Sequence, residues 1–437
     1  MNQEHKLLKL GVWVYFFLLI FEGALRKWFL PSLDAPLLII RDPIALWIVL
    51  YSIYYGIFPK SIFVTLMVII GIISVFTALF LGHGILPIAL FGGRILVIHF
   101  PLIFAIGKIF NREDVLKLGK MMIWLTVPMT ILLSMQYFLP QTAWVNLGLG
   151  GVVEERGFQG ANGHFRPSAT FSFITGTYLF YGLATSFIFY FWFNPNEIIK
   201  PVLILATFGL LAAIPFSISR TLLFEVAVSM LFFFIGASIN SKYFGKMAGT
   251  IVVGAIVLFV LSKTAFFQDS TDTFVARFTD ASATEGGLQG TIGDRFFGGL
   301  ISAITGSGQL PFFGWGIGLG TNVGSQLYAG GRLFLLHEEE WGRIIDEQGP
   351  ILGVAVVILR VALVIRLTIG CYARLIKGDM LPWMLLSFGF LAVGQGSWSQ
   401  PTSLGFCTLI GGLIIASFHS PSGGNLGSSI PEISLPN

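Results

Sequence analysis

SIFVTLMVIIGIISVFTALFL, at residues 61–81, is an unbroken apolar stretch without a single charged side chain. A helix of roughly 20 apolar residues is long enough to cross the hydrocarbon core of a bilayer. Comparable stretches recur along the chain and predict spans at 8–24, 36–58, 61–81, 85–107, 120–139, 171–193, 200–219, 222–239, 246–262, 349–367, 381–394 and 403–419. The sequence therefore predicts an all-α polytopic membrane protein with about twelve transmembrane helices, with eleven as the alternative count.

The composition of the whole chain agrees with a membrane location. Of its 437 residues 55% are hydrophobic and 11% charged, whereas about a quarter of the residues in a soluble protein are charged. The net charge of +4 is small and no long basic run occurs, so nucleic acid is not an expected partner. Cys371 and Cys407 show no spacing typical of a disulfide framework or a zinc site.

The lysines predict how the chain is oriented in the membrane. Cytoplasmic loops are enriched in lysine and arginine. A cytoplasmic N-terminus places most lysines inside, among them Lys60, Lys117 and Lys377, whereas the opposite orientation would export them. Both termini are therefore predicted to be cytoplasmic.

This orientation divides the chain into four parts. Residues 1–262 form a membrane domain with nine spans and a long outer loop at 140–170. A large outer loop, 263–345, precedes the last three spans, which occupy 346–419. The tail 420–437 is rich in Ser, Gly and Pro, a composition that predicts a disordered cytoplasmic segment.

Arginine dominates the outer loops, where only Lys27 and Lys263 represent lysine. A guanidinium is a planar fork that grips phosphate oxygens through two parallel hydrogen bonds. The pattern favours an anionic ligand, a phosphate group, on the outer face; the alternative is that exported loops merely avoid lysine. The candidate ligands of a diphosphate are Arg156, Arg166, Arg220, Arg277, Arg295 and Arg332.

Several familiar chemistries lack their motifs. The sequence has no P-loop, HExxH, GxSxG or Asp-x-Asp motif, which disfavours an ATPase, a zinc protease and a metal-dependent nucleotide-sugar transferase. If the ligand is a lipid diphosphate, the outer arginines would stabilise the charge that builds on it as it leaves. A nearby His or Glu could then remove the proton from an attacking sugar hydroxyl.

Other charges lie inside or beside the predicted spans. Arg94 falls within the fourth span, where an arginine is costly and normally faces a partner or a polar cavity. Arg220 could serve the same cavity, with Glu225 as a possible partner. The stretch FEGALRKWFLP at 21–31 is expected to anchor the first span at the interface through its Arg, Lys and Trp side chains.

The large outer loop contains two distinctive stretches. Glycines dominate GWGIGLGTNVG at 314–324, where the backbone can bend and come close to a ligand. Near the end of the loop Arg343 lies four residues from both Glu339 and Glu347, a spacing that predicts helical ion pairs. This helix is expected to continue into the span that begins at Ile351.

These features together resemble the O-antigen polymerase and ligase family of bacterial membrane glycosyltransferases. The resemblance is carried by HFRPSATFSFITGTYLFYG (164–182), SISRTLLFE (217–225), GDRF (293–296), PFFGWGIGLGTN (311–322) and EEWGRIIDEQGPILG (339–353). It implies a GT-C-like fold and a metal-independent, cofactor-free transfer of glycan from an undecaprenyl-diphosphate donor. The transfer would occur at the periplasmic face of the inner membrane, and chain-length regulators or other polysaccharide-assembly proteins are further candidate partners.

The family's functional residues map onto the two long loops. Arg166 matches the arginine that precedes the sixth span in the family. Polymerase members have an arginine followed by ten residues and a glycine, a spacing that Arg295 and Gly306 fit and that Arg166 and Gly176 miss by one residue.

The resemblance also implies a base near the end of the second loop. Ligase-like members have an essential histidine at a fixed distance before the glycine that opens the next span. Relative to Gly349, Glu338 occupies that position and His337 lies one residue further upstream. An imidazole titrates near neutral pH without help, which favours His337 as the base and leaves Glu338 to hold an arginine.

Three functions remain open. The leading hypothesis is a polymerase that joins lipid-linked oligosaccharide repeat units of an O-antigen or exopolysaccharide. A ligase that moves the finished glycan to an acceptor such as lipid A-core shares the donor. A transporter of lipid-linked oligosaccharides would show paired repeats, and the sequence has no convincing one.

Overall fold

The computed structural model of the protein describes residues 3–153, 157, 159–239, 244–284, 310–330, 336–337 and 339–419. Within these ranges the regular structure is helical, apart from one isolated bridge between Gln159 and Phe165. Eight helical segments are long and apolar enough to cross a membrane. The all-α prediction is thus confirmed for the described residues, and the eight segments agree with a polytopic membrane protein. The predicted tail 420–437 and much of the large outer loop lie outside the described residues.

The principal helices follow one another in a simple order. Those of the first half are α1 (Gln3–Ala24), α3 (Arg41–Tyr54), α4 (Ile62–Phe80), α5 (Leu86–Arg94), α6 (Phe100–Ile109), α7 (Arg112–Phe138) and α8 (Ile174–Phe193). Those of the second half are α9 (Lys200–Phe216), α10 (Arg220–Ile239), α11 (Phe244–Ser262), α12 (Ala265–Thr284), α15 (Asn322–Ala329), α16 (Glu340–Ile376), α17 (Met380–Gln395) and α18 (Pro401–Ser417). Short helical turns join them at η1 (Leu25–Phe29), η2 (Pro31–Leu33), α2 (Asp34–Leu37), η3 (Ile95–His99), η4 (Trp144–Asn146), η5 (Leu149–Gly151) and η6 (Pro195–Glu197).

Each predicted span overlaps a helix, or helical pieces joined end to end, as in α5, η3 and α6. The helices α9, α17 and α18 are apolar but shorter than the eight long segments. Hydropathy predicts these elements well because a segment that must bury all its backbone polar groups in lipid has to be helical.

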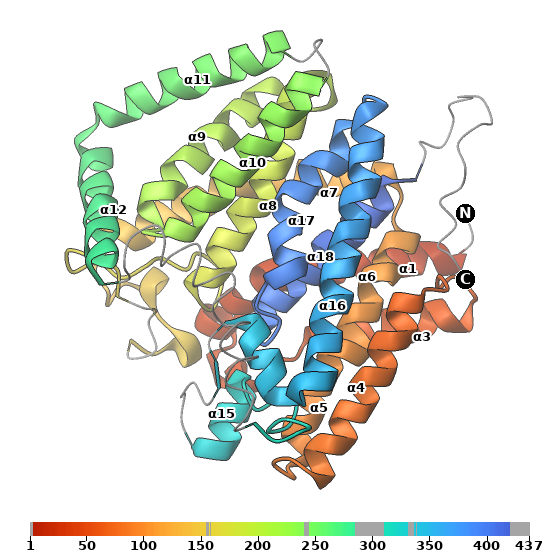
Figure 1. Ribbon diagram of the computed structural model, residues 1–437. Coiled ribbons are helices and arrows are strands. Elements are labelled where there is room, and N and C mark those ends of the chain that lie inside the picture. Colours follow the sequence, from red (N-terminus) through yellow and green to blue (C-terminus); the bar gives the residue numbers. More distant parts are fainter. Residues whose placement is uncertain are drawn as a thin grey trace.

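The bundle has an enclosed centre and two open edges. Helix α8 packs against α7, α9, α10, α17 and α18, whereas α11 and α12 lie at one edge and α3 and α4 at the opposite edge (Figure 1). Phe180, Leu183 and Phe187 of α8 are fully buried. A helix that is apolar around its whole circumference can be enclosed in this way, because it presents no polar face that needs water.

One end of the bundle is held together by side-chain ion pairs. Helix α7 begins with a capping box in which Asn111 and Asp114 each accept a hydrogen bond from the other's backbone amide. Asp114 also pairs with Lys9 of α1, and Arg112 pairs with Asp379 at 2.7 Å. These contacts fix the relative positions of α1, α7 and α17 at the end that the sequence predicts to be cytoplasmic.

The opposite end carries the polar loops. We call it the α16 end, because α16 begins there. The turns η1, η2 and η5 pack together at this end, and η4 contacts α7. Helix α15 contacts α5 there (Figure 1).

Candidate functional site

Helix α16 is broken near its start. Gly349 has φ 75° and ψ 175°, and Pro350 follows it. A Cβ at Gly349 would lie 2.2 Å from the carbonyl oxygen of Phe312, so any other residue would force the backbone apart. The break separates a short polar helical segment, 340–348, from the long apolar remainder of α16.

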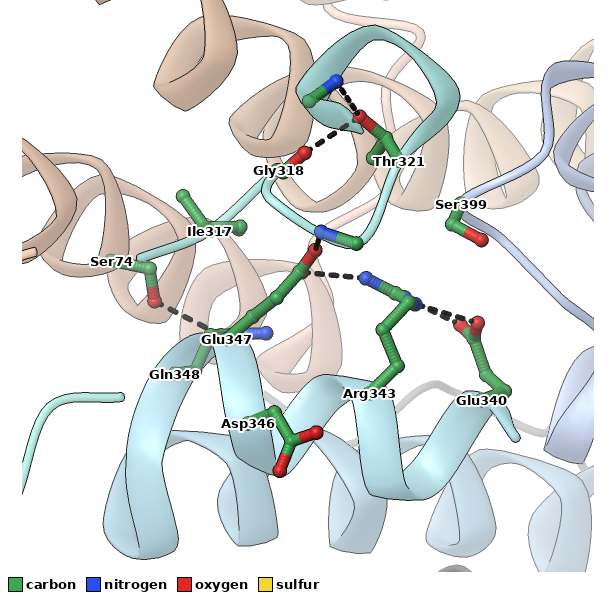
Figure 2. Close-up of polar contacts among 12 residues, drawn as sticks. Ser74, Ile317, Gly318, Thr321, Glu340, Arg343, Asp346, Glu347, Gln348 and Ser399 are labelled. Carbon is green, nitrogen blue, oxygen red and sulfur yellow. Dashed lines mark hydrogen bonds and ion pairs between the residues drawn. The ribbon is translucent and has the colours of Figure 1, made fainter. Parts of the chain in front are cut away.

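The polar segment contains a buried ion network. Arg343 pairs with Glu340 at 2.9 Å and with Glu347 at 2.5 Å, and Arg360 pairs with Glu340 at 2.7 Å (Figure 2 shows the pairs of Arg343). Arg360 also donates to the carbonyl oxygens of Val393 and Gly396. All four charged side chains are at most 5% exposed. Since two arginines balance two glutamates, this network holds α16 against α17 rather than offering charge to a ligand.

The network corrects one predicted pair and confirms another. Arg343 and Glu347 interact as their spacing predicts. The predicted pair of Glu339 with Arg343 is wrong, because Glu339 is the N-cap residue of α16 and Glu340 takes its place. Arg343 is therefore an ion-pair residue of the fold.

The glycine-rich loop lies directly on this segment. The amides of Trp315 and Gly316 donate to the carbonyl oxygens of Asp346 and Glu347 at 2.8 and 2.9 Å. The Gly320 amide donates to the Glu347 carboxylate at 2.8 Å, as the dashed line from a loop amide to Glu347 shows in Figure 2. These carbonyls precede the break, where the helix supplies no donor of its own. The loop satisfies them and fixes the polar segment.

The close approach of the glycines serves packing. Gly318 has φ 95°, and a Cβ there would lie 2.1 Å from the carbonyl oxygen of Ile88 in α5. The sequence predicts that this backbone comes close to a ligand; in the structure it comes close to α5 and α16 instead. Thr321 ends the loop by capping α15, where its hydroxyl accepts from the Gly324 amide.

His337 is bound to Asp346. The distance between His337 Nδ1 and Asp346 Oδ2 is 2.6 Å, and the His337 amide donates to the same oxygen at 3.0 Å. Where Nδ1 carries the ring hydrogen, it donates this hydrogen to the carboxylate and leaves Nε2 as the second ring nitrogen. Asp346 is 6% exposed and His337 38%, so the pair is anchored on one side and accessible on the other.

Asp346 is a site residue that the sequence did not reveal. Nine residues along one continuous helix would separate it from His337 by about 13 Å. His337 instead precedes α16, whose N-cap is Glu339, and the chain turns back toward the helix there. The only signal in the sequence is a carboxylate within the polar segment.

Arg166 lies at a recess on the same end of the bundle. The recess is narrow and partly open to solvent. It is lined by Lys27, Gln136, Gln141, Val145, Asn146, Leu147, Gly148, Gly157, Phe165, Arg166, Pro167, Ser168 and Ser172. Arg26 and Lys27, which the sequence predicts to anchor the first span at the interface, are only 6% and 2% exposed and are held by protein groups. Arg26 donates to Glu22, Ser172 and the carbonyl oxygen of Asp34.

Arg94 has the partner that its position in a span requires. It pairs with Asp42 of α3, which also lies 3.0 Å from His99 Nε2. The guanidinium stacks on the ring of Phe91 at 3.7 Å. Of the two expected surroundings, a partner or a polar cavity, the structure shows a partner, and it comes from the neighbouring helix α3.

Two of the predicted arginines stand on separate helices. Arg220 is the first residue of α10. The structure describes both Arg220 and Glu225 and shows no ion pair between them, so the expected pairing is wrong. Glu225 instead faces Gly182 of α8, where its Oε2 would lie 2.1 Å from an added Cβ. Arg277 lies in α12, a helix that also contacts Tyr137 of α7 through Asp269 and Thr273.

The remaining predicted site residues, Arg156, Arg295, Arg332 and Glu338, and Gly306 as well, lie outside the described residues. Comparison of the chain with known protein families, with curated proteins and with solved structures found no match. The family resemblance therefore stays a prediction, and a functional hypothesis must stand on the geometry of the described residues.

Proposed function

We propose that the protein is a glycosyltransferase that joins oligosaccharide repeat units carried on a lipid diphosphate, at the outer face of the membrane. The observation that carries this proposal is the bond between His337 and Asp346. A histidine oriented by a carboxylate is the arrangement with which many enzymes take a proton from a hydroxyl. We propose with it the topology expected from the lysines, with twelve spans, both termini in the cytoplasm and the α16 end in the periplasm of a bacterium.

In the proposed reaction the acceptor sugar hydroxyl attacks the anomeric carbon of the donor glycan. A new carbon–oxygen bond forms as the bond from the anomeric carbon to the phosphate oxygen breaks. The proton of the hydroxyl passes to His337 Nε2, and the lipid diphosphate leaves with the electron pair. Asp346 stabilises the imidazolium that forms, because it already accepts the hydrogen of Nδ1.

Arginines of the α16 end would offset the charge of the leaving diphosphate. Arg166 is the favoured candidate among those described, because it lines a recess that is partly open to solvent. Arg343 is not proposed for this role, since Glu340 and Glu347 already hold its guanidinium.

A ligase remains the second candidate, because it would use the same donor and also needs a histidine. The experiment that tests the proposal incubates purified protein with undecaprenyl-diphosphate repeat units, with and without lipid A-core. A ladder of longer glycans without lipid A-core supports the polymerase. Transfer to lipid A-core without any ladder favours the ligase, and no transfer in either mixture contradicts a glycosyltransferase.

A further inference from the structure

Lys27 is a buried cation without a carboxylate partner in the part of the chain that the structure describes. Its side chain is buried, and its ammonium donates to Ser168 Oγ at 3.0 Å and to the carbonyl oxygen of Ala169 at 2.7 Å. An ammonium has three hydrogens; two of them make these bonds, and the nitrogen also lies 4.6 Å from the centroid of the Trp28 ring. Burying an ion without a counter-charge costs free energy, so buried cations normally have an anionic partner.

Two buried or half-buried carboxylates of the neighbouring helices α1 and α3 are committed to other cations. Glu22 is bound by both Arg26 and Arg41, at 3.3 and 3.0 Å. Asp42 is bound by Arg94 and lies beside His99. Neither acid therefore neutralises Lys27, and the charge needed to do so must come from outside this cluster.

Lys27 lies in a π-helical turn that follows the first helix. Residues Leu25–Phe29 form a π-helical turn, η1, in which the amide of Leu30 donates to the carbonyl oxygen of Leu25 at 2.7 Å. Such turns are uncommon and occur frequently at functional sites.

The wall opposite Lys27 is also specially built. Ala169 has φ 50°, a left-handed conformation that costs free energy for a residue with a side chain. Gln136 maintains it by accepting from the Ala169 amide at 2.7 Å and donating to the Ala169 carbonyl at 3.2 Å. The Ala169 oxygen is thereby fixed toward Lys27.

Lys27 and Arg166 line the same recess, together with hydroxyl and amide side chains from Ser168, Ser172 and Asn146. No Asp or Glu is among its described lining residues. Two cationic side chains beside two serine hydroxyls suit the oxygens of a phosphate or diphosphate.

The surroundings of the recess favour a phosphate that is attached to a lipid. The chain leaves Lys27 through Phe29, Leu30 and Leu33, whose side chains are 65%, 43% and 46% exposed. Trp28 packs against Trp144 with ring centroids 5.0 Å apart, an aromatic pair of the kind found at the headgroup level of a bilayer. A ligand with an anionic head and an apolar tail would satisfy both the recess and these exposed side chains.

We infer that Lys27 and Arg166 form one subsite that binds the phosphoryl head of a membrane-embedded lipid. The inference rests on the proposed function only for the identity of that lipid as the glycan donor. Binding itself requires no turnover and can be measured separately.

The test titrates undecaprenyl diphosphate into the full-length protein in phosphatidylcholine nanodiscs. Lys27→Met should weaken binding at least tenfold, because it keeps the length of the side chain and removes the charge. Lys27→Arg should retain most of the binding. The matched control is Lys263→Met, which removes an exposed lysine outside the recess and should leave binding unchanged.

Thermal unfolding of the same variants separates a binding role from a structural one. Lys27→Met should unfold at the same or a higher temperature than the unchanged protein, because it removes a buried charge and Ala169 keeps Gln136 as a donor. If Lys27→Met binds undecaprenyl diphosphate with unchanged affinity, the inference is wrong. It is also wrong if both Lys27→Met and Lys27→Arg unfold at a lower temperature than the unchanged protein.

Two further arms identify the source of the phosphate and do not depend on any variant. Inorganic pyrophosphate should compete only weakly; competition as strong as that of the lipid would contradict a lipid-borne head. A diazirine placed near the diphosphate of the lipid should cross-link to residues 27–31, 144–148 or 165–172 of the unchanged protein. Cross-links found only elsewhere would refute the subsite. If the lipid binds at the recess but no glycan is ever extended, the proposed function fails while the subsite stands.

Discussion

Single residues at the α16 end differ in whether their charge is already satisfied. Arg343 and Arg360 share Glu340 and are fully engaged with protein groups. Lys27 has only neutral acceptors among the described residues. The first two therefore belong to the fold, and Lys27 is the cation whose burial points to a ligand.

The structural role of Arg360 leads to a prediction about stability. Arg360→Met should cost about 3–5 kcal/mol, because Glu340 then loses one of its two buried cations. The double variant Arg360→Met with Glu340→Gln should recover part of that loss, since it removes both charges together. Thermal unfolding in detergent checks this, and strictly additive effects of the two substitutions would show that the pair is not coupled.

Spacing along one helix predicts one of the two ion pairs expected for Arg343 and misses the other. The i to i+4 spacing was enough for Arg343 and Glu347. The partners of His337 and Lys27 could not be predicted, because a chain reversal brings Asp346 to His337 and a loop over 140 residues away brings Ser168 to Lys27. Arg94 is an intermediate case. Its position within a predicted span indicates that it needs a partner or a polar cavity, but the sequence does not identify Asp42 as that partner.

At the scale of elements, the break in α16 decides where the polar segment lies. Hydropathy located the apolar part of this helix but contained no signal for the angle between its two parts. Gly349 and Pro350 in the sequence are consistent with a break, yet the close approach of the Phe312 carbonyl is a tertiary contact. The same limitation applies to η1, whose π-helical turn leaves no recognised signature in the residues Leu25–Phe29.

Gly349→Ala should destabilise the protein by about 3 kcal/mol or more, because the new Cβ combines an unfavourable φ with a backbone overlap. The expected result is a lower unfolding temperature and a loss of glycan extension. Gly245→Ala is a suitable control, since a Cβ there meets nothing within 4 Å among the described atoms. Equal stability of the two variants would mean that the break does not depend on Gly349.

For the molecule as a whole, the two ends of the bundle differ in kind. One end is joined by compact ion pairs between helices, such as Arg112 with Asp379. The α16 end carries the recess, the glycine-rich loop and the exposed histidine. The long helices were predictable from apolar stretches alone, whereas the loops that build the α16 end depend on contacts between distant parts of the chain.

The proposed orientation can be tested by cysteine labelling in intact cells. Gln326 in α15 and Lys377 after α16 are exposed and lie at opposite ends of the bundle, while the native Cys371 and Cys407 are buried. A membrane-impermeant maleimide should label Gln326→Cys directly and Lys377→Cys only after permeabilisation. The reverse result would place the α16 end in the cytoplasm and exclude a periplasmic reaction.

The central claim is that His337, oriented by Asp346, removes the proton of the acceptor hydroxyl. The most direct measurement is glycan extension by the purified protein and its His337→Ala variant, with His5→Ala as the matched control. The account predicts that His337→Ala extends glycans about 10²- to 10⁴-fold more slowly while it still binds the lipid donor, and that His5→Ala is unaffected. Extension at the normal rate by His337→Ala would contradict the claim that His337 is the base. If Glu338→Gln were also inactive in that case, the base would be Glu338.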